Sequence, residues 1–215
     1  MNRKLTLACS LLAVMIGPSL ADTPAPASKI TRTFDILREG SKIGTVVEEL
    51  EKQGDMTTVK FKTHISVVVM FIEAYHVDHA SSETWNGNQL VSFKSQKDEN
   101  GKKHSVSATV VGDKIDLEAD GKHSELPRTA IPSSMWSRAF VSATQMFDDG
   151  DGKRLVIKVS DLGDENLEVK GAKHQVRHYQ ISGDFKRDLW FEGDTLLRLK
   201  LTGSDGSKIT SELRP

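Results

Sequence analysis

The densest group of metal-ligand and acid–base side chains in the sequence is the run His76-Val77-Asp78-His79. Because side chains alternate across a strand, His76 and Asp78 share one face and His79 points to the other. Two local ligands do not complete a mononuclear site, so a metal would need a further histidine from a neighbouring strand. Polar histidines on a solvated strand explain the same run, and we predict no bound metal and no cofactor.

Other candidate chemistry is incomplete. His174 and His178 share a strand face but lie roughly 13 Å apart along it, too far for one metal. The run D-D-G-D-G at residues 148–152 is similar to the start of a calcium loop, but it lacks the glutamate at the twelfth position and is interpreted as a turn. Glu48 and Glu49 point to opposite strand faces, and no G-x-S-x-G run is present. We therefore predict that the protein is not an enzyme, with a hydrolase as an alternative.

The composition excludes several classes of protein. Lys and Arg number 29 and Asp and Glu number 30, for a net charge of −1, which disfavours a nucleic-acid-binding protein. The single cysteine, Cys9, excludes an intramolecular disulfide framework and a cysteine-based zinc site.

The first 21 residues have the three parts of a secretory signal peptide. A positive start at Arg3-Lys4 precedes an apolar run over residues 5–16, and small residues lead to a predicted cleavage after Ala21. The apolar run is shorter than the roughly 20 residues that span a bilayer, so we predict no integral membrane segment. We expect a periplasmic protein, with extracellular release as the alternative.

The rest of the chain is predicted to form a tether over residues 22–29 and a single domain over residues 30–215. Apolar residues alternate at period two between turn signals, which predicts about thirteen antiparallel strands. So many twisted strands should curl into a half-barrel or a closed barrel. The apolar run at residues 67–72 predicts a strand that is covered on both faces or that lines a cavity.

One segment departs from this pattern. Ser133 or Ser134 can cap a helix over residues 134–147, with apolar side chains repeating at spacings of three and four. We expect this amphipathic helix to pack on the concave side of the curled sheet. Its apolar stripe comprises Trp136, Ala139, Phe140, Ala143 and Phe147.

Several phrases, taken in order, resemble a family of secreted proteobacterial proteins of unknown function. They are F-D-I-L-R-E-G-S-K-I-G at 34–44, E-T-W-N-G-N-Q-L-V-S-F at 83–93, P-S-S-M-W at 132–136, D-L-W-F-E-G-D-T-L-L-R-L at 188–199 and D-G-S-K-I at 205–209. The resemblance implies a β half-barrel or β-spiral, similar in shape to the periplasmic lipoprotein carriers. It implies no catalytic residues.

The large apolar side chains suggest a function. We expect a set of them to line the concave side and bind a lipid or another hydrophobic ligand, which predicts a non-enzymatic binding or carrier protein. Ordinary core packing is the alternative explanation for this set. The alternative function is a cell-envelope structural or interaction protein that holds a protein partner through its sheet edges. The predicted ligand-binding residues are Met70, Phe71, Tyr75, Trp136, Phe140 and Trp190.

Overall fold

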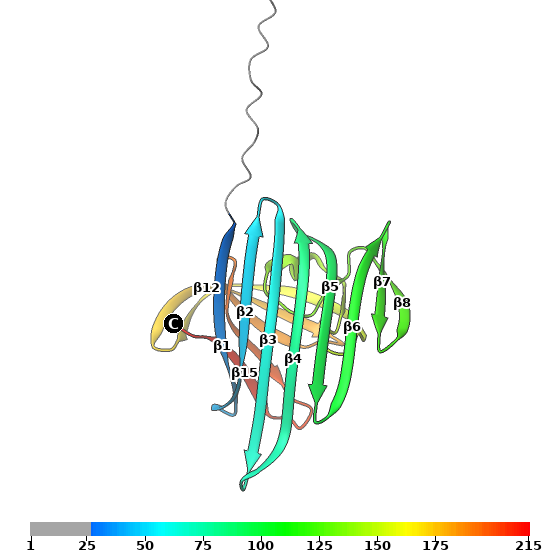
Figure 1. Cartoon of the computed structure of the whole chain (residues 1–215). Coiled ribbons are helices and arrows are strands. Elements are labelled where there is room, and N and C mark those ends of the chain that lie inside the picture. The colour runs from blue at the N-terminus through cyan, green and yellow to red at the C-terminus, as the bar shows by residue number, and fades with distance from the viewer. Residues whose placement is uncertain (1–26) are drawn as a thin grey trace, which may run out of the picture.

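The computed structural model describes residues 27–215, so the predicted signal peptide and most of the predicted tether lie outside the described residues. The first half of the domain is a run of antiparallel hairpins (Figure 1). Its strands are β1 (Ser28–Arg38), β2 (Ser41–Gln53), β3 (Met56–Val69), β4 (Ile72–Asn86), β5 (Gln89–Glu99), β6 (Lys102–Val111), β7 (Lys114–Ala119) and β8 (Lys122–Pro127).

The second half opens with a short irregular segment and then returns to long hairpins. Its elements are β9 (Ile131–Pro132), the 3-10 helix η1 (Arg138–Ser142), β10 (Gln145–Phe147), β11 (Arg154–Val169), β12 (Ala172–Gly183), β13 (Arg187–Glu192), β14 (Thr195–Thr202) and β15 (Lys208–Leu213).

The fifteen strands of residues 27–215 belong to one open sheet in the order β8-β7-β6-β5-β4-β3-β2-β1-β15-β14-β13-β12-β11-β10-β9. Every neighbouring pair is antiparallel except β9 and β10. Strand β1 therefore lies in the middle of the sheet, and from it the chain runs to the β8 edge, crosses to the other edge and returns until β15 pairs with β1. The predicted antiparallel, mainly β fold is confirmed, with two short strands beyond the expected thirteen.

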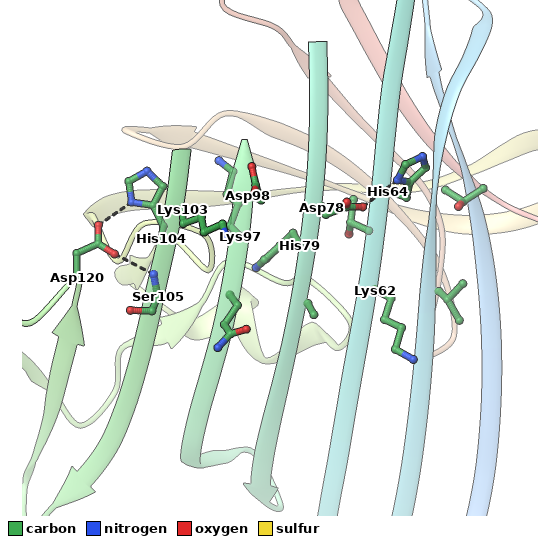
Figure 2. A pocket seen from close by; sticks show the side chains of 15 residues that line it. Lys62, His64, Asp78, His79, Lys97, Asp98, Lys103, His104, Ser105 and Asp120 are labelled. Atoms are coloured by element: carbon green, nitrogen blue, oxygen red, sulfur yellow. Dashed lines mark hydrogen bonds and ion pairs between the residues drawn. The ribbon is translucent and has the colours of Figure 1, made fainter. Parts of the chain in front are cut away.

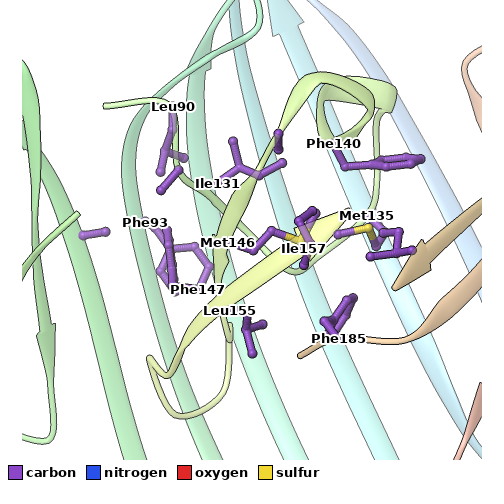
Figure 3. Close-up of a cluster of buried hydrophobic side chains, with 14 of the residues drawn as sticks. Leu90, Phe93, Ile131, Met135, Phe140, Met146, Phe147, Leu155, Ile157 and Phe185 are labelled. Carbon is purple, nitrogen blue, oxygen red and sulfur yellow. The ribbon is translucent and has the colours of Figure 1, made fainter. Parts of the chain in front are cut away.

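The hydrophobic core lies between the two halves of the sheet, on the side that Figure 1 shows to be covered by β11 to β14. The segment at residues 128–153, called here the crossing segment, fills this space. Figure 3 shows its side chains packed between those of β5 and those of β11. Phe147 meets Phe93 of β5 edge to face, with ring centroids 5.1 Å apart. Burial of aromatic surface of this size holds the two halves together.

The expected amphipathic helix over residues 134–147 is wrong. No α-helix is assigned within residues 27–215, and none of their helices is long and apolar enough to cross a membrane. Ser137 caps only the short helix η1, and the chain is extended again at Ala143. Serines at 133, 134, 137 and 142 favour caps and turns over helix interiors, which opposes the apolar repeat. The backbone instead pairs β10 with β11 and β9, while Phe140 and Phe147 stay buried.

The expectation that residues 67–72 are covered on both faces is also wrong. This run spans the end of β3, a two-residue turn at Met70 and Phe71, and the start of β4, where Val69 pairs with Ile72. The side chains of Met70 and Phe71 are exposed, and both residues have positive φ angles, 49° and 68°. Because the turn contains neither Gly nor Asn, the sequence carries no turn signal there, and the apolar run is interpreted as one continuous strand.

Candidate functional site

The core contains an inner cavity of about 260 Å³ between β1–β3 and the strands β13–β15. Ten of its lining residues are apolar and nine are polar. The apolar lining is Phe34, Ile36, Val46, Phe61, Ile65, Phe185, Leu196, Leu199, Leu201 and Ile209, and the polar lining is Glu48, Thr63, His79, Ser133, Ser134, Asp148, Asp149, Arg187 and Ser211. Sites for small organic ligands are lined mainly by apolar side chains with a smaller number of polar groups that orient the ligand.

Arg187 is the basic side chain in the wall of the inner cavity. Its guanidinium carbon lies 3.9 Å above the ring of Phe185, and Nη1 donates to the carbonyl oxygen of Lys186 at 2.7 Å. Burial lowers the pKa of Arg187, while the charges of Asp148 and Asp149 act in the opposite direction. Within the described part of the chain, no carboxylate forms an ion pair with this guanidinium. Arg187 also lines an outer groove with Lys186, so it lies between the cavity and solvent.

Glu48, one of three acidic residues in the cavity wall, is compensated by an arginine. Its side chain is buried and faces Arg32 on the adjacent strand, with Arg32 Nη1 2.6 Å from Glu48 Oε1. Burial raises the pKa of Glu48, and the charge and hydrogen bond of Arg32 oppose that rise. Since Arg32 already neutralises Glu48, the arginine left for a ligand is Arg187.

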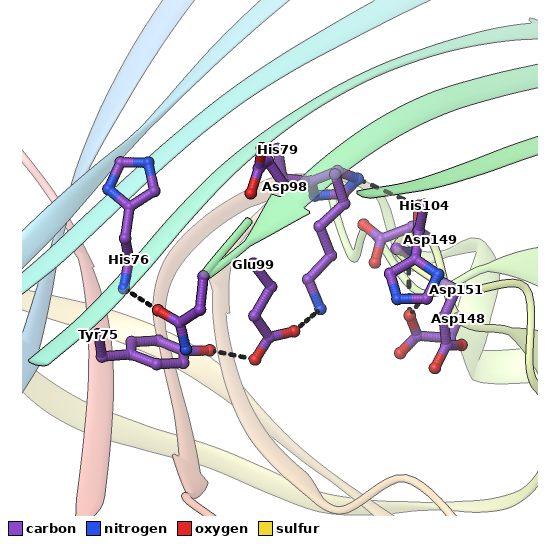
Figure 4. Close-up of polar contacts among 12 residues, drawn as sticks. Tyr75, His76, His79, Asp98, Glu99, His104, Asp148, Asp149 and Asp151 are labelled. Atoms are coloured by element: carbon purple, nitrogen blue, oxygen red, sulfur yellow. Dashed lines mark hydrogen bonds and ion pairs between the residues drawn. The ribbon is translucent and has the colours of Figure 1, made fainter. Parts of the chain in front are cut away.

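The Asp148–Gly152 loop forms part of the inner wall and is a turn, as the sequence predicted. The carboxylate of Asp148 accepts from the backbone N–H groups of Gly150 at 2.9 Å and Asp151 at 3.1 Å. The carbonyl oxygen of Asp149 lies 3.0 Å from His79 Nε2, and this contact from β4 appears in Figure 4. The aspartates therefore build the turn and fix it to the sheet.

A buried carboxyl that sequence reasoning missed lies beside the crossing segment. Glu83 of β4 accepts through Oε2 from Trp85 Nε1 at 2.7 Å and from Trp136 Nε1 at 3.0 Å, while its Oε1 has no hydrogen-bond partner among residues 27–215. Burial raises the pKa of Glu83 to about 7, against hydrogen bonds from Ser134 and the two tryptophans that lower it. The available signal was strand parity, because Glu83 falls on the same face as Trp85 and Val77.

On the opposite face of the sheet, His76 and Asp78 share a face and His79 points inward, as the sequence predicted. The neighbouring strand adds His64, whose Nδ1 lies 2.8 Å from Asp78 Oδ1 (Figure 2). His64, His76 and Asp78 offer ligand atoms that all lie within 4.8 Å of one another. The sequence indicated that a metal site would need a third histidine from a neighbouring strand, but it did not identify His64. The position of the β3–β4 turn decides which residues of these two strands face each other.

The structure does not bring the six predicted ligand-binding residues together. Met70 and Phe71 lie at the exposed β3–β4 tip. Tyr75 donates to Glu99 at 2.7 Å, and Figure 4 shows this contact. Phe140 is buried in the main core against Tyr179.

The two predicted tryptophans lie in different places. Trp136 meets Trp85 edge to face, with ring centroids 5.7 Å apart, at the margin of the main core. Trp190 belongs to a second, smaller apolar cluster with Leu167 and Leu197, where its ring stacks on His178. The predicted set therefore does not line one cavity, and the inner cavity has a different lining.

The fold and its cavity define the class: a mainly β protein in which residues 27–215 form one open sheet that borders a small, partly apolar cavity. The family model described as Domain of unknown function (DUF6134) matches residues 34–214, and the chain belongs to that family. A search of the curated proteins finds no match to this chain. The predicted membership of an uncharacterised family is confirmed, while secretion and proteobacterial origin remain predictions.

Proposed function

We propose that the protein is a non-enzymatic binding or carrier protein for an amphipathic anion, such as a fatty acid or a lipid with an acidic head. The observation that carries this proposal is the inner cavity, in which Arg187 lies beside apolar side chains and near Asp148 and Asp149 but forms an ion pair with no carboxylate among the described residues. The apolar part of the ligand would lie among the side chains of β1–β3 and β13–β15. Its acidic group would meet Arg187 at the mouth.

Physical chemistry favours an anion at this position. A guanidinium pairs with carboxylate or phosphate through charge-assisted hydrogen bonds that are about twice as strong as neutral ones. Each square ångström of apolar ligand surface removed from water adds roughly 25 cal/mol. The cavity of about 260 Å³ is slightly below the usual range for ligand sites, so it suits a short chain or one segment of a longer chain.

The proposal agrees with the expectations from the sequence. A curled, half-barrel-like sheet around an apolar space is the shape that the resemblance to lipoprotein carriers implies. Cleavage after Ala21 would deliver such a carrier to the periplasm, where lipids need a carrier to cross water. A cell-envelope interaction protein remains the first alternative and a hydrolase the second, which a panel of ester and glycoside substrates tests.

Native mass spectrometry and calorimetric titration with decanoate test the proposal. We expect one decanoate to bind, and Arg187→Gln to weaken binding by about 10-fold or more. Lys186→Gln is the matched control, because it removes the neighbouring positive charge from the outer groove alone. Ser211→Phe, which fills the cavity, should abolish uptake.

Two results would overturn the carrier proposal. One is that the wild-type protein neither binds added decanoate nor carries a co-purified lipid. The other is equal affinity in the wild type and Arg187→Gln, provided that thermal unfolding shows both proteins to be folded.

A second candidate function is attachment to a lipid bilayer through the tip at residues 68–72. All five residues of this tip are apolar and more than half exposed, with Phe71 at 103%. Since both faces of the hairpin are apolar there, the occupant must surround it, as a bilayer does. The sheet edges are less suited, because the exposed β8 edge carries Lys122, His123 and Glu125.

Sedimentation with vesicles of phosphatidylcholine and phosphatidylglycerol tests the tip. We expect Phe71→Ser to reduce the bound fraction several-fold, whereas Val111→Ser, at an exposed apolar residue on another strand, should leave it unchanged. Absence of wild-type binding would reject a bilayer as the occupant.

A further inference from the structure

A cluster of potential metal ligands lies on the outer face of β3 and β4, on the opposite side of the sheet from the inner cavity. It contains His64 from β3 with His76 and Asp78 from β4. The strand register places His64 directly opposite Asp78, and Ser66 directly opposite His76. His64 Nδ1 is 2.8 Å from Asp78 Oδ1, and His76 Nε2 is 2.9 Å from Asp78 Oδ2. Two imidazoles therefore converge on one carboxylate from two adjacent strands.

Contacts around His76 resemble the outer shell of a metal site. The second ring nitrogen of His76, Nδ1, lies 3.3 Å from Glu73 Oε1, and Ser66 Oγ donates to that same oxygen at 2.5 Å. Histidines that bind metals usually donate their other N–H to a carboxylate, which fixes the ring and leaves one nitrogen free for the ion. Glu73 can fix His76 in this way, with Nε2 directed at Asp78.

The backbone at His76 is also held in place. The His76 N–H donates to Asn100 Oδ1 at 2.8 Å, and the Asn100 N–H donates back to the His76 carbonyl oxygen at 3.0 Å. Asn100 lies in the turn that joins β5 and β6. Ligands carried on paired strands and held by such contacts are more precisely placed than ligands on a loop.

We propose that His64, His76 and Asp78 form a zinc-binding site with Glu73 and Ser66 as supporting residues. Two imidazole nitrogens and one carboxylate oxygen match the ligands of zinc, whereas calcium and magnesium take oxygen ligands. Three protein ligands leave one tetrahedral position open. His64 and Asp78 border an outer groove of about 720 Å³, so water or an anionic group can reach that position.

The test is calorimetric titration of the untagged protein with Zn²⁺ alone. We expect one ion per chain with micromolar or tighter affinity, and X-ray absorption at the zinc edge should show nitrogen and oxygen ligands only. His64→Ala and Asp78→Asn should each weaken binding by 10-fold or more. Glu73→Gln, which leaves all three ligands in place, should weaken it by about 10-fold.

His123→Gln is the matched control. His123 is exposed and contacts the carboxylate of Asp116, as His64 contacts Asp78, but it lies outside the cluster. Its replacement should leave zinc binding unchanged. Equal affinity in His64→Ala and His123→Gln, or no zinc binding by the folded wild type, would overturn the proposal. Decanoate binding in the inner cavity should not change in His64→Ala, so the two proposals fail separately.

Discussion

The indole N–H of Trp136 donates to the buried carboxylate of Glu83 at 3.0 Å and so joins the crossing segment to β4. The same oxygen accepts from Trp85, while the second carboxylate oxygen has no hydrogen-bond partner in the described part of the chain. An ionised carboxylate buried with only partial hydrogen bonding costs free energy, which is why the pKa of Glu83 is raised to about 7.

Glu83 should make the fold less stable as pH rises. Between pH 4.5 and about 7 the folded protein keeps a proton that the unfolded chain has released, so the free energy of unfolding falls across this window and then levels off. The contribution is about 3 kcal/mol. Urea unfolding of wild type and Glu83→Gln at pH 4 and pH 8 measures this contribution. Between pH 4 and pH 8, the free energy of unfolding of Glu83→Gln should rise by about that much relative to the free energy of unfolding of wild type. Glu125→Gln, at an exposed carboxyl, is the control. The prediction would be contradicted if Glu83→Gln and wild type differed by the same free energy of unfolding at both pH values.

Asp35 should have the opposite pH dependence. Lys42, Lys170 and Arg214 contact its carboxylate at 2.7, 3.2 and 2.9 Å, and these partners hold its pKa well below the usual range. The stabilisation is therefore complete above the unfolded-state pKa and is lost as pH falls through the folded-state value. Because the three cations are partly solvated, we expect Asp35→Asn to cost roughly 1–3 kcal/mol at pH 7.

The cost of Asp35→Asn should shrink in acid, as urea unfolding at pH 7 and pH 3 would show. Asp194→Asn, which removes an exposed ion pair with Arg138, serves as the control and should cost less than about 1 kcal/mol. An equal cost for Asp35→Asn at both pH values would mean that its ion pairs contribute nothing.

Phe140 should carry a large share of the stability of the crossing segment. Its ring is buried and lies within 5.6 Å of the Tyr179 ring and 5.7 Å of the Phe191 ring, measured between centroids. We expect Phe140→Ala to lower the free energy of unfolding by roughly 3–5 kcal/mol. The neighbouring exposed Val141→Ala should change it by about 0.5 kcal/mol or less. Similar small losses in both denaturant melts would show that this segment is not part of the core.

The β3–β4 tip should be a source of strain. Met70 and Phe71 occupy the left-handed region that Asn100 and Gly101 occupy in the β5–β6 turn, with φ angles of 52° and 85° at the latter pair. A left-handed conformation costs a residue with a Cβ roughly 1–2 kcal/mol. Met70→Asn combined with Phe71→Gly should therefore raise the melting temperature.

The matched control for the tip is Met70→Ala combined with Phe71→Ala. It removes the same exposed side chains but keeps residues with a Cβ in the left-handed region, so it should give little or no gain in melting temperature. If both double variants were equally stabilised, the gain would come from lost apolar exposure and not from relieved backbone strain.

The sequence alone determined the fold class, because period-two alternation and Gly, Asn and Asp turns are local signals. It also placed His76 and Asp78 on one face and His79 on the other, since side-chain alternation needs no knowledge of neighbouring strands. It could not find the β3–β4 turn, which Met70 and Phe71 form without Gly or Asn, and so it could not pair His64 with Asp78.

Only the tertiary structure decided what the apolar residues do. The repeat at Trp136, Phe140 and Phe147 is compatible with a helix, but the free energy of filling the space between the two halves of the sheet selected an irregular, largely extended segment. Likewise, the inner cavity combines Arg187 with residues of β1–β3 that are far away in sequence. The pairing of β1 with β15 is what brings those two parts of the sheet together, and no local pattern in the sequence encodes it.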